Sequence, residues 1–262
     1  MTTKPSVLIT GASSGIGVVY ADRFAKRGHD LVLVARDRSR MEALADNLRR
    51  ETDVAIDILQ ADLTDAWQLA QVEVRLREDT RIGILVNNAG MSAAGGFLSQ
   101  SANDVTRIVN LNAMALLRLA HASAPRFVKA GEGAIINIGS VAVLMPEYGS
   151  TVYGATKAFV LFLSRGLQVE LGPKGVYVQA VLPAATRTEI WERSGKDVNK
   201  LSGVMEADEL VDAALAGFDR RETVTIPSLP LVDQWTDFDA ARKVMIPNFN
   251  QVHAAERYRD AA

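Results

Sequence analysis

Two short segments of this chain combine residue types whose spacing suits chemistry. Residues 10–17 read Thr-Gly-Ala-Ser-Ser-Gly-Ile-Gly and directly follow the apolar run Val7–Ile9. Far downstream, Tyr153 is followed four residues later by Lys157. The first segment suits a backbone that approaches a pyrophosphate closely, and the second suits a phenol whose proton can be transferred. Together they indicate an oxidoreductase that uses a nicotinamide dinucleotide.

The glycines of the first segment lie at positions 11, 15 and 17, in the order G-x-x-x-G-x-G rather than the usual G-x-G-x-x-G. Gly11 permits a tight turn, Gly15 lets the backbone approach the phosphates, and Gly17 lets the following helix pack on the sheet. The first turn of that helix offers N–H groups and a partial positive charge to an anion. The alternative is an ordinary strand-to-helix turn with chance glycines.

Tyr153 and Lys157 share one face of a predicted helix because they are four residues apart. A free tyrosine, with a pKa of about 10, is a poor base at neutral pH, and a nearby ammonium group favours its phenolate. Ser140 lies 13 residues before Tyr153, at the end of a predicted strand, where its hydroxyl can hold a carbonyl oxygen. The alternatives are a chance helical pair and, for Ser140, a helix cap or a turn.

The composition excludes several other kinds of chemistry. The chain has 262 residues, no cysteine and a formal net charge of −2, so we expect no disulfide, no thiol chemistry and no attraction to nucleic acid. The three histidines, His29, His121 and His253, lack the spacing of metal ligands, and we expect no metal site. The first strand is expected near Ser6, which leaves no room for a signal peptide. No apolar run reaches the roughly 18 residues of a membrane span, so we expect a cytoplasmic protein without a membrane partner.

Apolar runs rich in β-branched residues alternate with amphipathic stretches along most of the chain. Runs such as Leu31–Ala35 are almost wholly apolar, which is typical of parallel strands covered by helices on both faces. The alternation predicts an α/β fold with a Rossmann-like, doubly wound, parallel seven-stranded sheet in a single domain over residues 1–262. The expected strands are 6–10, 31–35, 54–59, 83–87, 133–139, 176–182 and 223–226.

The glycine segment and the ordered set Ser140, Tyr153 and Lys157 resemble the cofactor and catalytic motifs of the short-chain dehydrogenase/reductase (SDR) family. The resemblance covers about residues 5–226, and residues 227–262 form an atypical C-terminal extension. It implies hydride transfer between nicotinamide and a ketone or secondary alcohol. It also implies that Tyr153 is the general acid/base, that Ser140 positions the substrate oxygen, and that Lys157 tunes the phenol and binds ribose.

The resemblance also implies an asparagine as a fourth catalytic residue, which holds a water that links the lysine to solvent. Asn110 and Asn112 are the two candidates. Counting back from Ser140 without a gap places Asn112 at the family's position, whereas Asn110 would require a two-residue insertion. We therefore assign the catalytic set to Asn112, Ser140, Tyr153 and Lys157.

The residue that follows the second strand indicates which cofactor is bound. In dinucleotide-binding proteins an acidic side chain near this place binds the ribose 2′-hydroxyl. This chain has Arg36, 19 residues after Gly17, and a guanidinium can grip a 2′-phosphate instead. We therefore favour NADP(H), with NAD(H) as the alternative because Asp37 is adjacent. We assign Arg38 and Arg40 to the solvated face of the next helix.

The other expected cofactor contacts come from the glycine segment and from the resemblance. The resemblance places Asp62 beside the adenine amino group and residues 88–90 along the cofactor. One departure from the family is Ala184, where a glycine usually follows the sixth strand. The expected contacts besides Arg36 are Gly11, Ser13, Ser14, Gly15, Ile16, Gly17, Asp62, Leu63, Asn88, Ala89, Gly90, Tyr153, Lys157, Pro183, Thr186 and Thr188.

The resemblance implies that substrate specificity comes from residues 91–98, 141–149 and 187–205. Apolar side chains in these segments predict an apolar pocket and a hydrophobic carbonyl substrate; they are Met91, Phe97, Leu144, Met145, Tyr148 and Trp191. A non-catalytic NADP(H)-binding regulator on the same fold is the main alternative, although it would need no proton relay. A sugar-nucleotide epimerase or dehydratase is disfavoured by the short chain and by the glycine spacing.

The helices expected at 102–129 and 152–171 carry apolar residues beyond one face. In the resembling family these helices pair across a two-fold axis, which is also the commonest symmetry of oligomers. We therefore expect at least a homodimer through these helices, with a homotetramer as the alternative. The apolar residues of the tail, such as Trp235, Phe238 and Phe249, are expected to pack on this subunit or on a neighbour.

Overall fold

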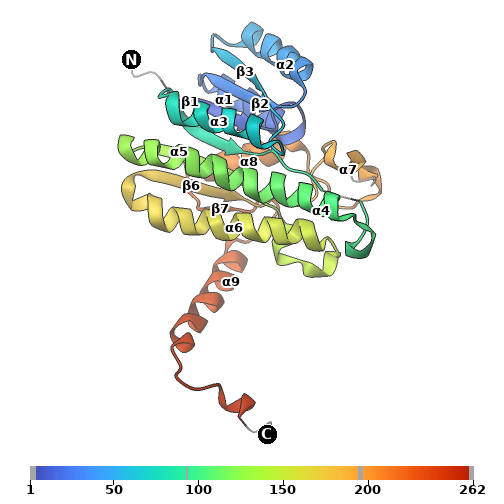
Figure 1. Ribbon diagram of the computed structural model, residues 1–262, viewed down its shortest axis with the longest axis vertical. Helices are drawn as coiled ribbons and strands as arrows, with labels where there is room; N and C mark the ends of the chain where they lie inside the picture. Colours follow the sequence, from blue (N-terminus) through green and yellow to red (C-terminus); the bar gives the residue numbers. More distant parts are fainter. Residues whose placement is uncertain (1–3, 93, 194–196, 260–262) are drawn as a thin grey trace. The chain divides into compact units, whose positions relative to one another are not determined.

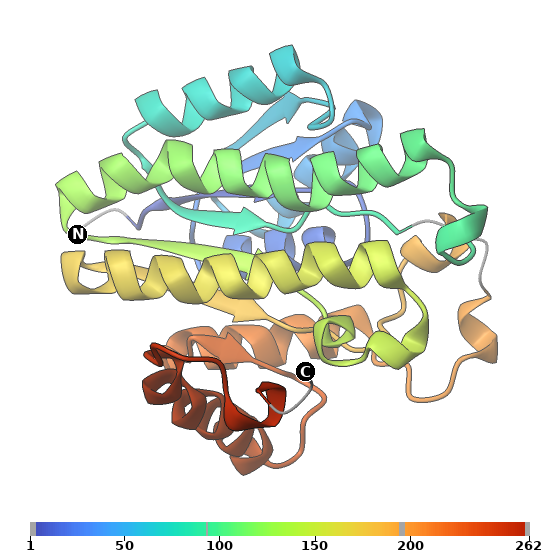
Figure 2. The same ribbon diagram turned by 60° about the horizontal axis from the view of Figure 1, so that its bottom comes forward.

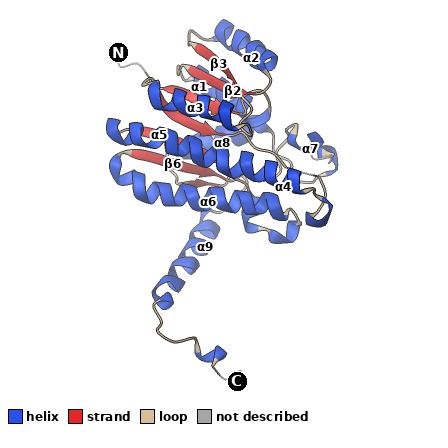
Figure 3. Cartoon of the chain, viewed as in Figure 1, coloured by secondary structure: helices blue, strands red, loops and turns tan. Residues whose placement is uncertain are grey.

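The structure of the chain, a computed structural model, describes residues 4–92, 94–193 and 197–259. The chain divides into two compact units, Met1–Pro227 and Ser228–Ala262. The first unit contains a seven-stranded sheet, whose strands are red in Figure 3. In chain order the strands are β1 (Ser6–Thr10), β2 (Leu31–Ala35), β3 (Ile56–Gln60), β4 (Ile82–Asn87), β5 (Gly133–Ile138), β6 (Val176–Val181) and β7 (Val224–Thr225).

All neighbouring strands run parallel, in the order β3-β2-β1-β4-β5-β6-β7. This arrangement confirms the expected doubly wound, Rossmann-like α/β sheet. The expected strands agree with the observed ones to within two residues at each end. The strand order reverses between β1 and β4, and in such sheets the carboxyl ends of the strands at this point form the ligand crevice.

Helices cover both faces of the sheet, and α5 and α6 run side by side across one of them in both views (Figures 1 and 2). Val7 and Ile9 of β1 belong to a core with α1, α2 and α8, whereas Leu8 belongs to a core with α3, α5 and α6. Because successive strand residues point to opposite faces, both faces demand apolar side chains, which explains the continuous apolar runs. The α-helices of this unit are α1 (Gly15–Lys26), α2 (Arg38–Glu51), α3 (Ala66–Glu78), α4 (Ala102–Val109), α5 (Leu116–Ala130), α6 (Thr151–Leu171), α7 (Ile190–Arg193) and α8 (Ala207–Asp219).

The expectation of one continuous helix over residues 102–129 is wrong. α4 ends at Val109, and a π-helical segment, Asn110–Ala115, leads into α5. Such wide turns are rare and often occur at functional sites, because the extra residue changes where side chains point. This segment contains Asn112, whose side chain is buried. The interruption therefore lies at one of the residues selected from the sequence.

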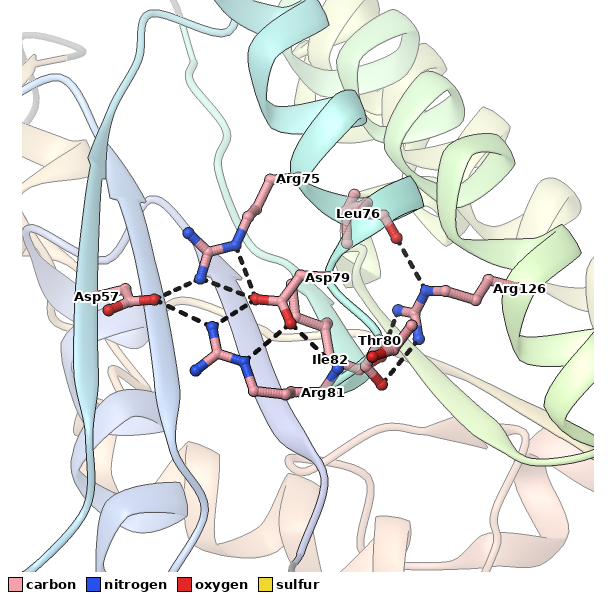
Figure 4. A network of polar contacts seen from close by, with 8 residues as sticks. All are labelled: Asp57, Arg75, Leu76, Asp79, Thr80, Arg81, Ile82 and Arg126. Carbon is pink, nitrogen blue, oxygen red and sulfur yellow. Dashed lines mark hydrogen bonds and ion pairs between the residues drawn. The ribbon is translucent and has the colours of Figure 1, made fainter.

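A network of charged side chains joins α3, β3, β4 and α5 at the amino-terminal edge of the sheet (Figure 4). Arg126 of α5 donates to three backbone carbonyls around the end of α3 and the start of β4. A hydrogen bond from Arg81 lowers the pKa of Asp79 to about 2. Ion pairs thus tie the elements together at this edge, opposite the carboxyl edge where ligands bind. The residues drawn are Asp57, Arg75, Leu76, Asp79, Thr80, Arg81, Ile82 and Arg126.

The second unit contains α9 (Val232–Met245) followed by two short 3₁₀ turns, Ile246–Phe249 and Glu256–Tyr258. No residue of α9 is buried, and the rings of Trp235 and Phe238 stack with their centroids 5.5 Å apart. The packing of this tail on its own subunit or on a neighbour stays a prediction. In the part of the chain that the structure describes, no helix combines the length and apolar character that crossing a membrane requires.

Candidate active site

The turn between β1 and α1 requires glycine for steric reasons. Gly15 has a φ of +55°, in the left-handed region that favours glycine. A Cβ on Gly17 would lie only 2.3 Å from the carbonyl oxygen of Gly11 and 2.6 Å from Nδ2 of Asn88. The Asn88 amide in turn donates to the carbonyl oxygens of Thr10, at 2.9 Å, and Gly11, at 3.2 Å. The glycine segment is therefore held against the end of β4, as a close backbone approach to a dinucleotide requires.

The amino terminus of α1 is open toward an anion. Ser14 precedes the helix, and its side chain makes no capping hydrogen bond. The first N–H groups of α1 therefore lack a side-chain cap, and they carry the positive end of the helix dipole. This arrangement fits the pyrophosphate of a dinucleotide, with the predicted residues 13–17 all placed at the turn.

An open cleft of about 1000 Å³ lies beside this turn. It is lined by Ser13, by Arg36 at the end of β2, and by Gln60 at the end of β3. Arg38 and Arg40 also line the cleft, so their assignment to a solvated helix face is incomplete. The cleft thus presents several guanidinium groups where a 2′-phosphate would lie.

Ser140, Tyr153 and Lys157 meet at the carboxyl end of β5. Ser140 follows this strand, and its Oγ accepts from the N–H of Ala142 at 3.1 Å, which fixes its position. Tyr153 lies in the first turn of α6, where the Ser140 side chain is close enough to lower the pKa of the phenol. Lys157 lies one turn later, with Nζ 5.6 Å from the centroid of the Tyr153 ring. The structure therefore brings together the three residues selected from the sequence.

The ammonium group of Lys157 is removed from solvent. The residue is 5% exposed, and its Nζ donates to the carbonyl oxygen of Ile138 at 2.8 Å. Burial lowers the pKa of Lys157 to about 8. Burial also raises the pKa of Tyr153, an effect that the nearby Ser140 side chain opposes. At neutral pH the site therefore holds a neutral phenol near a protonated lysine, which is the state that can donate a proton to a carbonyl oxygen.

Asn112 lies beside this lysine and holds the loop after β4. Its amide accepts from the N–H of Met91 at 2.8 Å and donates to the carbonyl oxygen of Met91 at 2.9 Å. A Cβ placed on Gly90 would lie 3.4 Å from Oδ1 of Asn112 and 3.6 Å from Nζ of Lys157. Asn110, in contrast, is only partly buried. This placement fits the choice of Asn112, whose role in a proton relay stays a prediction.

The segment after β6 returns the chain to the glycine turn. Pro183 and Thr186 are buried, and the Thr186 hydroxyl donates to the carbonyl oxygen of Ala184 at 3.0 Å. A Cβ on Gly15 would lie 3.0 Å from Cγ2 of Thr188. Thr188 therefore lies against the glycine turn, next to the expected pyrophosphate site. Residues 93 and 194–196, which belong to the expected substrate segments, lie outside the described residues.

The residues expected near the adenine are placed around the end of β3. The carboxylate of Asp62 accepts from the N–H and the hydroxyl of Thr64, at 2.9 and 2.7 Å, and Leu63 is buried. The N–H groups of Asn88 and Ala89 both donate to Oγ1 of Thr10 at 3.0 Å. These bonds fix the loops, and the contacts of these residues with a cofactor stay predictions.

Sequence reasoning missed a buried chain of polar side chains behind the site. Nδ2 of Asn87 donates to Oδ1 of Asn137 at 2.9 Å, and Nδ2 of Asn137 donates to Oγ of Ser164 at 2.9 Å. The chain joins β4, β5 and α6, which carry the residues around the reaction centre. Its signal in the sequence is an asparagine inside each of two otherwise apolar strands, because a buried amide must find partners.

The family to which the chain belongs follows from comparison with known proteins. The family model of short chain dehydrogenases matches residues 5–199. This chain belongs to the short-chain dehydrogenase family. The motifs had predicted this family, whose members are oxidoreductases. Among the residues that the structure describes, no group of three or more His, Asp or Glu side chains could hold a metal ion.

Short-chain dehydrogenases of known structure match nearly the whole chain. The enzyme from Sphingobium yanoikuyae, solved in complex with NADPH, is 64% identical, with a TM-score of 0.96 over 97% of this chain and 100% of that chain. The bulky-bulky ketone specific alcohol dehydrogenase from Comamonas testosteroni is 59% identical, with a TM-score of 0.92 over 98% of this chain and 100% of that chain. Most of the tail therefore lies within the region that these two comparisons cover.

Curated relatives match a smaller part of the chain. Sulfoacetaldehyde reductase from Chromohalobacter salexigens is 40% identical over 192 residues, which are 70% of this chain and 73% of that protein. Hydroxysteroid dehydrogenase-like protein 1 from Gallus gallus is 31% identical over 185 residues, which are 70% of this chain and 56% of that protein. The chain thus spans little more than half the length of the latter relative.

The buried ammonium predicts a pH-dependent stability. The pKa of Lys157 in the folded chain, about 8, lies below its ordinary value of 10.5. Between these values the unfolded chain binds more protons, so this group makes the free energy of unfolding rise with pH, whereas below about pH 8 its penalty is constant. From pH 8 to pH 10.5 the free energy of unfolding of the wild type should therefore rise relative to that of Lys157→Met. Urea denaturation of both proteins at matched pH would measure this difference. A difference that does not vary with pH would contradict a buried, titrating lysine.

Proposed function

We propose that this protein is an NADP(H)-dependent carbonyl reductase that works in reverse as an alcohol dehydrogenase. The observation that carries the proposal is the position of Lys157, whose Nζ lies 5.6 Å from the centroid of the Tyr153 ring, together with the Ser140 side chain beside the same phenol. A phenol, a hydroxyl and an ammonium converge at the carboxyl end of β5, at the edge where this kind of sheet binds ligands. A regulator that only bound NADP(H) would need no such arrangement.

The side chains supply the proton chemistry of the reaction. The bound cofactor would supply the hydride that reaches the carbonyl carbon. Tyr153 donates its proton to the carbonyl oxygen, and the Ser140 hydroxyl holds the same oxygen in place. The positive charge of Lys157 stabilises the phenolate that forms. In the oxidation direction the phenolate accepts the proton of the alcohol.

The preference for NADP(H) over NAD(H) rests on Arg36. This side chain lines the cleft beside the glycine turn, and a guanidinium matches the geometry of a phosphate. The adjacent acid, Asp37, caps α2 by accepting from the N–H of Arg40 at 3.0 Å. The proposal is supported by the Sphingobium yanoikuyae relative, which was solved with NADPH.

We propose a ketone with apolar groups on both sides of the carbonyl as the substrate class. Phe97, Leu144 and Tyr148 are 60%, 37% and 73% exposed, and they lie in loops that follow β4 and β5. Exposed apolar side chains at the carboxyl edge of the sheet favour a hydrophobic ligand. The name of the relative from Comamonas testosteroni supports the same class.

The proton donor can be tested by removing one oxygen atom. Tyr153→Phe should lower kcat for ketone reduction by at least about a hundredfold, the scale of general acid catalysis, while NADPH binding persists. Steady-state kinetics and fluorescence titration of NADPH measure these two quantities. Tyr177→Phe, at a tyrosine near the amino-terminal end of β6 whose hydroxyl donates to the carbonyl oxygen of Glu222, is the matched control. Full activity of Tyr153→Phe would refute the assignment.

The cofactor preference can be tested at Arg36. Arg36→Asp should weaken NADPH binding and shift the ratio of kcat/KM for NADPH and NADH toward NADH, because a carboxylate repels the 2′-phosphate and can bind the ribose hydroxyl. Arg50→Asp, near the far end of α2, controls for the change in net charge. If the wild type already prefers NADH, the assignment of Arg36 is wrong.

We also propose that the protein is at least a homodimer, with a homotetramer as the alternative. Large apolar side chains are exposed on α6 and on the π-helical segment, which is unusual for a surface without a partner. They are Met114, Phe159, Phe162 and Val169, and Phe162 is 82% exposed. Light scattering at micromolar concentration should give at least twice the chain mass, and Phe162→Glu should shift the protein toward monomer. A monomeric wild type would exclude the dimer.

A further inference from the structure

One ion pair connects the cleft to the segment after β6 over a long distance in sequence. Nη1 of Arg40 donates to both carboxylate oxygens of Glu189, at 2.7 and 2.8 Å. Arg40 lies in the first turn of α2, and Glu189 lies directly before α7. The side chains are 50% and 38% exposed, so solvent reaches the pair and it can open and close. Both residues line the cleft that contains Arg36.

The residues on either side of Glu189 also make contacts within this region. Thr188, the residue before Glu189, lies against the glycine turn, where a Cβ on Gly15 would be 3.0 Å from its Cγ2. Two successive residues of this segment therefore contact the two elements that would hold the phosphates of the cofactor. On the other side of Glu189, Nε1 of Trp191 donates to the carbonyl oxygen of Thr186 at 2.7 Å, which links α7 back to the start of the same segment.

A second ion pair in the same cleft makes no such connection. Nε of Arg38 donates to Oε1 of Glu42 at 2.7 Å, four residues along α2. Glu42 lines the cleft just as Glu189 does. The two carboxylates therefore bring similar charge to the expected 2′-phosphate site, and only Glu189 ties another part of the chain to it. This pair offers a built-in control.

We infer that the Arg40–Glu189 pair is a clasp that holds the segment after β6 over the phosphate end of the bound cofactor. The inference rests on the proposed NADP(H) site. Nη1 of Arg40 donates to Glu189 and Nε lies 3.5 Å from Oδ2 of Asp37, while Nη2 donates to no protein group among the described residues. A guanidinium offers donors in more than one direction, so Arg40 can hold Glu189 and a 2′-phosphate together. Glu189 acts as a positioning residue, and the phosphate of NADP(H) becomes part of the link.

The clasp predicts how fast the cofactor leaves. Glu189→Gln should release NADPH about two- to fivefold faster, the scale expected for one solvent-exposed ion pair, and should raise KM for a ketone more than it changes kcat. Glu42→Gln should not accelerate release, since it removes similar charge without cutting the connection. Stopped-flow fluorescence of NADPH displaced by excess NADP⁺ measures the rate, and the release of NADH should change less than that of NADPH.

The outcomes separate the clasp from the cofactor assignment. A wild type that binds NADPH no more tightly than NADH would overturn the proposed NADP(H) site, and the clasp with it. A wild type that prefers NADPH, together with equal release rates for Glu189→Gln and Glu42→Gln, would overturn the clasp alone. Glu189→Asp, which keeps the charge on a shorter side chain, should lie between the wild type and Glu189→Gln if the ion pair matters. Thermal melting of each variant checks that the fold is intact.

Discussion

The buried ammonium of Lys157 is the constraint on which the site depends. An ammonium group that leaves water loses a large hydration energy, and the carbonyl oxygen of Ile138 at 2.8 Å replaces part of it. Ile138 is the last residue of β5, after which the chain turns to Ser140. The end of one strand therefore supplies both the acceptor for Lys157 and the Ser140 hydroxyl that lowers the pKa of Tyr153. The charge that burial disfavours is the one that would stabilise the phenolate in the proposed reaction.

The two edges of the parallel sheet carry different kinds of side-chain contacts. At the amino-terminal edge, ion pairs and Arg126 connect α3, β4 and α5. At the carboxyl edge, the strands end in residues that contact one another across the crevice: Thr10 with Asn88, and Asn87 with Asn137. The reaction centre and the cofactor cleft are assembled from these strand ends. Rigid strands thus position groups that lie far apart in the sequence.

The sequence predicted the sheet well because every strand must be apolar on both faces, and such runs are visible without a structure. The glycine turn and the set Ser140, Tyr153 and Lys157 were also visible, because each has a fixed spacing. The π-helical segment around Asn112 was not, because its residues have no pattern that separates it from an α-helix. The pairing of Arg40 with Glu189 spans 149 positions between two exposed residues, and charge alone does not specify such partners.

Transfer of deuterium from labelled cofactor to product tests the central claim most directly. In the proposed reaction a hydride moves between nicotinamide and a carbonyl carbon while Tyr153 supplies the proton. NADPH carrying two deuterium atoms at nicotinamide C4 would be incubated in ordinary water with the enzyme and an aryl alkyl ketone, and the alcohol would be analysed by mass spectrometry. The expected product is an alcohol with one deuterium on the carbinol carbon. An alcohol without deuterium, or no alcohol from any bulky ketone, would contradict the proposed reaction.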